Sequence, residues 1–140
     1  MLAVLLLSLI GISWRPLGQL SMMWPANAVV LGLFLRIPQL ASPAGWIAAA
    51  CGYLLADFLA GSTWAISITL NLINLLSVFI ALVLCMHLNK TAQPLTSPGA
   101  LPRLLLAVTT ASIISGLASG LLSWQFFARP LWPSAPRWAV

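Results

Sequence analysis

Charged side chains are almost absent from this chain, and that scarcity restricts its possible folds more than any other feature. Six Lys or Arg and one acidic residue are spread over 140 residues, of which 61% are hydrophobic. Soluble domains carry about 25% charged residues, because a globule in water needs a solvated surface. Seven charges cannot cover such a surface. The sequence therefore predicts a protein that faces hydrocarbon.

Five apolar stretches are separated by short segments with Pro, Gly and charge. They cover residues 1–14, 26–35, 44–60, 64–87 and 103–127. With no water in the bilayer core, each stretch must be helical to satisfy its own backbone. We predict an all-α polytopic transmembrane helix bundle with about five membrane segments. Residues 1–128 form one incomplete transmembrane domain, and residues 129–140 an extramembrane loop or the start of another helix.

Two stretches are too short to cross a bilayer as straight helices of about 20 residues. The first either continues toward Leu20 or has lost its start. The second follows Trp24 and Pro25 and runs for only about ten residues, so we expect a short or broken helix with Pro25 at its N-terminal end. Such helices exist only where protein or a wet cavity covers the backbone. This is the most irregular place in the sequence.

The net charge of +5 invites a nucleic-acid reading, but the cations are not clustered. They lie singly near the ends of apolar runs, where a membrane helix can hydrate them. They are Arg15, Arg36, Lys90, Arg103, Arg129 and Arg137. Their positions exclude a nucleic-acid partner. Because they divide equally between the two membrane sides, they do not fix the orientation.

Polar side chains recur on one face of the stretch 64–87. Ser67, Asn71, Asn74 and Ser77 are spaced by four, three and three residues, which places them on the same side of a helix. Near mid-membrane such amides point into the bundle. They serve either as hydrogen bonds between helices or as the polar lining of a ligand pocket, and both readings stay open.

Asp57 is the only acidic residue of the chain. A lone carboxylate in a membrane segment is a functional candidate by default. We expect Arg15 or Arg129 to pair with it, so an ion pair that fixes helix ends is the alternative to a functional role.

Small residues form a stripe on the stretch 103–127. Gly116 and Gly120 make a GxxxG motif, which lets two helix backbones approach closely. We assign helix packing, within the chain or between two copies, to Ser112, Ser115, Gly116, Ser119 and Gly120.

Catalysis needs groups that this chain lacks. Acid and base pairs and metal sites require several titratable side chains, whereas the sequence has one Asp, no Glu and one His. Cys51 and Cys85 lie inside apolar runs. We therefore expect no catalytic residue, no metal and no cofactor in this chain.

Three motifs in order resemble a known family. Trp24-Pro25-Ala26-Asn27-Ala28 opens a short helix that ends at Arg36, the segment 52–61 reads GYLLADFLAG, and Asn71-Leu72-Ile73-Asn74 follows in a long helix. Over residues 15–127 this resembles the membrane-associated sensor domain of the first MASE type, found in bacterial diguanylate cyclases and some histidine kinases.

The chain departs from that family at two positions and in extent. The family usually has Gly at the position of Ala28 and often Glu at that of Asn74, which puts a family-wide ligand role for Asn74 in doubt. The family domain is also longer, so the chain corresponds to its N-terminal half, without a GGDEF domain.

The resemblance implies a sensory input module in the bacterial inner membrane. It would regulate a cytoplasmic diguanylate cyclase, and thus cyclic di-GMP, or a histidine kinase. A multi-pass domain with a cytoplasmic N-terminus and a homodimer are also implied. The candidate signalling or ligand-pocket residues are Trp24, Pro25, Asn27, Asp57, Asn71 and Asn74, and the small-molecule ligand is unknown.

Two alternatives belong to other functional classes. A small solute transporter or vitamin-binding membrane subunit suits the broken helix at Pro25 and the face with Asn71 and Asn74, because midplane binding sites use such helices. A structural assembly partner is the other.

Overall fold

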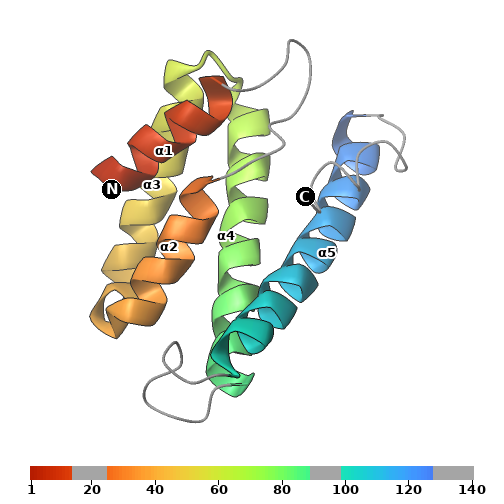
Figure 1. The fold of residues 1–140 in the computed structure, drawn as a ribbon. Coiled ribbons are helices and arrows are strands. Elements are labelled where there is room, and N and C mark those ends of the chain that lie inside the picture. Colours follow the sequence, from red (N-terminus) through yellow and green to blue (C-terminus); the bar gives the residue numbers. More distant parts are fainter. Residues whose placement is uncertain (14–24, 89–98, 128–140) are drawn as a thin grey trace. The chain divides into compact units, whose positions relative to one another are not determined.

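The computed structural model describes residues 1–13, 25–88 and 99–127, and these residues are mostly helical, without any strand. The all-α prediction is confirmed for this part of the chain (Figure 1). Residues 129–140 and Trp24 lie outside it. The elements are α1 (Leu2–Ser13), α2 (Pro25–Arg36), the 3-10 helix η1 (Pro38–Ala41), α3 (Pro43–Leu59), α4 (Trp64–Leu88) and α5 (Ala100–Phe127).

The chain divides into two compact units, and the boundary falls inside α4. The first unit comprises residues 1–75, and the second comprises residues 76–139. Each unit is described by itself.

Proline sets the starts of the helices in the first unit. Pro25 and Pro43 are the first residues of α2 and α3. Proline fits there because its missing N–H would have no partner within the helix. The side-chain oxygen of Ser42 also accepts a bond from Gly45 N at 3.4 Å, which caps α3. The predicted short helix beginning at Pro25 is confirmed.

The start of α5 differs from the prediction. We expected a polar linker to extend through Pro102, but the helix begins at Ala100 and includes that proline. The reason is that the first turn of a helix tolerates proline, which breaks a helix only in its interior.

Close packing holds α1, α2 and α3 together. α1 packs on α3 and on α2, and a Cβ added at Gly52 of α3 would lie 3.0 Å from both Met1 O and Val4 Cβ. The rings of Phe34 and Trp46 meet edge to face at 4.9 Å and connect α2 to α3. A small residue at position 52 is thus what lets α1 approach.

The turn from α3 to α4 depends on glycine and two aromatic rings. Gly61 has a φ of 78°, a conformation that costs glycine little. Ser62 N donates to Asp57 O at 3.0 Å, and the Phe58 and Trp64 rings lie 4.1 Å apart. The tight turn predicted at residues 61–63 is therefore present.

Gly45 is the position of the first unit least able to accept a side chain. A Cβ there would run directly into the carbonyl oxygen of Leu40, a backbone atom that cannot rotate away. We expect Gly45→Ala to lower the free energy of unfolding by about 1–2 kcal/mol through overpacking. Denaturant titration in mixed micelles measures it. Gly32→Ala, with nothing within 4 Å of the added methyl group, is the control, and equal stability of the two variants would contradict the prediction.

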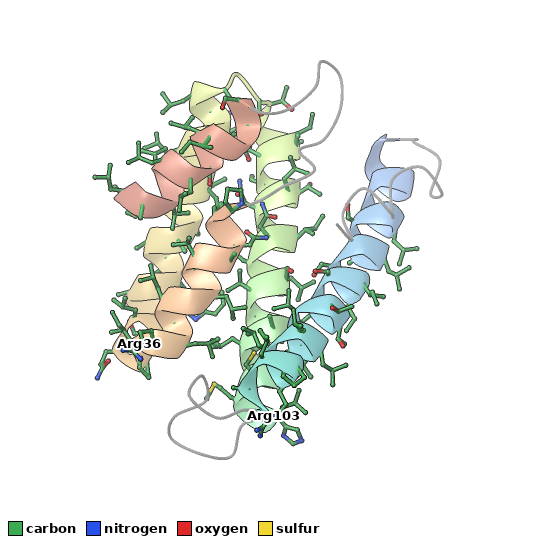
Figure 2. The ribbon with its side chains drawn as sticks, in the orientation of Figure 1. Arg36 and Arg103 are labelled. Carbon is green, nitrogen blue, oxygen red and sulfur yellow. The ribbon has the colours of Figure 1, made fainter. Side chains whose placement is uncertain are left out.

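Two arginines lie at helix ends. Arg36 is the last residue of α2, and Arg103 lies in the first turn of α5 (Figure 2). In the second unit the Arg103 guanidinium donates to Gly99 O at 2.8 Å and to Leu88 O at 3.4 Å. A cation at the last carbonyl of α4 complements the negative end of the helix dipole.

The helices differ in their ability to cross a bilayer. α4, with 25 residues, and α5 are long and apolar enough to do so, whereas α1, α2 and α3 have 12, 12 and 17 residues. A hydrocarbon core of about 30 Å needs roughly 20 helical residues. Two of the five predicted membrane segments thus meet the length requirement.

Candidate functional site

Three helices of the first unit meet at Asn27. The hydroxyl of Tyr53 on α3 donates to Asn27 Oδ1 at 2.6 Å. Asn27 Nδ2 in turn donates to Asn74 Oδ1 on α4 at 3.2 Å. Asn27 lies in the first turn of α2, where Pro25 fixes the start of the helix. One amide therefore connects the short helix to both of its neighbours.

A second link joins α3 to α4. Asn71 Nδ2 donates to Asp57 Oδ2 at 2.9 Å and to the backbone carbonyl of Ser67 at 2.7 Å. Asp57 follows Tyr53 by four residues, and Asn71 precedes Asn74 by three, so each pair shares a helix face. We call the set Asn27, Tyr53, Asp57, Ser67, Asn71 and Asn74 the polar seam.

Most of the polar seam is buried, and Asn27 is half-buried. Asp57 is 1% exposed, Asn71 and Asn74 are 3% exposed, and Tyr53 is also buried. Burying a polar group is costly unless it is hydrogen-bonded, so these contacts fix the register of α2, α3 and α4 within the first unit. A bond to a carboxylate is stronger than one between neutral groups, which makes Asp57–Asn71 the strongest link.

The structure brings together four of the six predicted site residues, namely Asn27, Asp57, Asn71 and Asn74. Pro25 lies two residues from Asn27, and Trp24 lies outside the described residues. The amides of Asn71 and Asn74 form hydrogen bonds between helices. This is one of the two hypotheses for the polar face of the stretch 64–87.

The predicted partners of Asp57 cannot be compared, because Arg15 and Arg129 lie outside the described residues. The described partner is Asn71. Sequence reasoning missed Tyr53, although its position four residues before Asp57 places it on the same face of α3.

Large hydrophobic side chains are exposed in unusual number for a soluble protein. Twenty-six large hydrophobic side chains are exposed among the described residues, and the buried core includes only two leucines, Leu31 and Leu82. The buried set is instead rich in alanine and in polar residues. The buried polar residues are Ser8, Asp57, Ser67, Asn71, Asn74, Ser115 and Ser119.

The small-residue stripe of α5 is buried in the single chain. Ser115, Gly116, Ser119 and Gly120 are buried, and Ser112 is half-buried.

Among the described residues no group of three or more His, Cys, Asp or Glu is placed to hold a metal.

Comparison with known proteins gives no match to a family model, to a curated protein or to a solved structure.

Proposed function

We propose that this chain is an integral membrane sensory input module of a bacterial signalling protein. The many exposed large hydrophobic side chains carry the membrane part of the proposal. Exposed leucine and isoleucine are unfavourable in water at about 25 cal/mol per Å² of apolar area, and a soluble monomer rarely exposes large contiguous apolar patches. In lipid the same side chains are well solvated, while the polar seam finds partners inside.

The hydroxyl groups of two threonines fit a bilayer as well. Thr69 and Thr110 are half-buried, and each hydroxyl donates to a backbone carbonyl one turn earlier, Ala65 O and Leu106 O, at 2.8 Å. A polar group that faces hydrocarbon must find its partner within its own helix. This behaviour is compatible with α4 and α5 lying in a bilayer, and we infer a multi-pass arrangement in which the short helices lie in the membrane beside α4.

The sensory part rests on the polar seam together with the resemblance to the first MASE type. A signal that displaces α2 has to break the bonds of Asn27 to Tyr53 and Asn74. We propose that a stimulus acts by shifting the equilibrium between the bonded state of α2 and a state without these bonds. The output is a cytoplasmic diguanylate cyclase or histidine kinase outside this chain. The proposal includes a cytoplasmic N-terminus, the inner membrane and a homodimer.

Cys51 tests the membrane part directly. It is exposed at the middle of α3, while Cys85 is buried. We expect a charged, membrane-impermeant maleimide to leave Cys51 unlabelled in membranes and to label it after dissolution in SDS, because a charged reagent does not enter hydrocarbon.

The control for this experiment is Thr63→Cys, in the exposed turn between α3 and α4. It should react in membranes opened to the reagent from both sides. Labelling of Cys51 as fast as that of the control would mean that α3 faces water, and the membrane proposal would fail.

The signalling part needs the gene in its natural context. Residues 1–128 of the parent protein are replaced by an inert membrane anchor, and cellular cyclic di-GMP or kinase autophosphorylation is measured. We expect the output to lose its dependence on the membrane domain. An unchanged output would reject the sensory role, and solute uptake by cells that express the chain alone would point to a transporter.

A further inference from the structure

Two buried oxygen atoms on α4 have no hydrogen-bond partner among the protein groups that the structure describes. They are Ser67 Oγ and Asn71 Oδ1, on residues that are 0% and 3% exposed. The two residues are four apart and therefore share one face of the helix. That face meets α3 at Asp57. Buried polar atoms without a partner are rare in native proteins and require an explanation.

The orientation of the Asn71 amide follows from its neighbours. Its Nδ2 group lies 2.9 Å from Asp57 Oδ2 and 2.7 Å from Ser67 O. The Ser67 carbonyl oxygen and a carboxylate oxygen can both only accept hydrogen bonds. The NH₂ group of Asn71 must therefore face both of them. Asn71 Oδ1 is therefore left as an acceptor that needs a donor.

The hydroxyl of Ser67 does not bond to a backbone carbonyl of its own helix, unlike the hydroxyls of Thr69 and Thr110. The hydroxyl groups of Thr69 and Thr110 bond to a carbonyl one turn back. The carbonyl one turn before Ser67 is Thr63 O, which accepts from Ser67 N at 2.9 Å, and Ser67 Oγ does not bond to it. The hydroxyl of Ser67 thus remains available to a further group.

We propose that Ser67 and Asn71 form a binding site for a single water molecule between α3 and α4. The water donates one hydrogen to Asn71 Oδ1 and exchanges a hydrogen bond with Ser67 Oγ, and Asp57 adds a third polar neighbour. Buried waters typically make about three such bonds to otherwise unsatisfied groups. The proposal goes beyond the sensory function and does not depend on it.

The charges around the site favour a neutral occupant. The Asp57 carboxylate repels an anion. A cation beside that carboxylate would draw the Asn71 oxygen toward itself, whereas the amide presents its NH₂ group to Asp57. Water needs neither change, and it satisfies an acceptor and a hydroxyl at once.

Water-edited solid-state NMR tests the site in the full chain in liposomes. The protein is labelled with ¹⁵N-asparagine, and the side-chain signal of Asn71 is assigned by its loss in Asn71→Leu. Asn74 is the internal control, because its Oδ1 accepts from Asn27. We expect magnetisation from water to reach Asn71 about threefold faster than Asn74, since a bound water contacts only the former.

Two further arms identify the occupant. Ser67→Ala should slow the transfer to Asn71 to the Asn74 rate, and replacing sodium by choline should change nothing. Three results would overturn the proposal: equal rates at Asn71 and Asn74 in the wild type, fast transfer that Ser67→Ala leaves unaltered, or fast transfer only with sodium present, which would indicate a cation site.

Discussion

Leu72→Lys is expected to reduce membrane integration of the chain about a hundredfold. Leu72 is 62% exposed and lies near the middle of α4. A lysine near the centre of a membrane helix costs about 2.5–3.5 kcal/mol in insertion free energy, and each 1.4 kcal/mol is a factor of about ten. The ratio of inserted to non-inserted chains, measured with glycosylation sites on both sides of α4, gives this value.

Met86→Lys is the control that distinguishes the cost of a charge at mid-membrane from a general effect of adding a charge. Met86 is 66% exposed, like Leu72, but it lies two residues from the end of α4. A lysine there can extend its ammonium group to the headgroup region, so we expect little change in the same ratio. In water both exposed lysines would be harmless. Equal insertion of the two variants would therefore contradict the membrane proposal.

The helices were predictable because their ends are marked by chemistry. Pro25 and Pro43 mark two helix starts, and the segment 61–63 marks a turn. The predicted start of α5, at residue 103, was wrong, because the helix begins at Ala100. Pro102 was taken to end the linker, although it occupies the first turn of the helix. Proline is informative about a nearby helix end but does not tell on which side of it the helix begins.

The inward faces were predictable only where they carry polar groups. In a membrane helix the lipid-facing and protein-facing sides are both apolar, so hydrophobic periodicity cannot separate them as it does in soluble helices. Asn71, Asn74 and Asp57 were recognised because a polar group in hydrocarbon must face protein.

The pairing of the polar groups could not be predicted from the sequence. An amide that must be buried can bond to any donor or acceptor at its depth, and the register between α2, α3 and α4 decides which one. Asn74 pairs with Asn27 and Asn71 with Asp57. Tyr53 was missed because its ring is apolar and only its hydroxyl, at the far end, belongs to the polar seam.

Asn27→Leu is expected to destabilise the first unit by removing two hydrogen bonds between helices. The substitution keeps the side-chain volume roughly constant but removes the bonds to Tyr53 and to Asn74. Side-chain hydrogen bonds in membranes are worth about 0.6–1.7 kcal/mol each. The loss of two gives about 1–3 kcal/mol, measured as the free energy of unfolding of the full chain by SDS titration in mixed micelles.

Tyr53→Phe and Leu33→Ala are the variants with which the loss of unfolding free energy in Asn27→Leu is compared. Tyr53→Phe removes one of the two bonds, so about half of the effect is expected. Leu33 is exposed on the same helix, and its truncation should cost little. If Asn27→Leu were no more destabilising than Leu33→Ala, the bonds of Asn27 would not hold α2 in place. A stimulus could then move the short helix without breaking them, and the polar seam could not act as the element that a signal shifts.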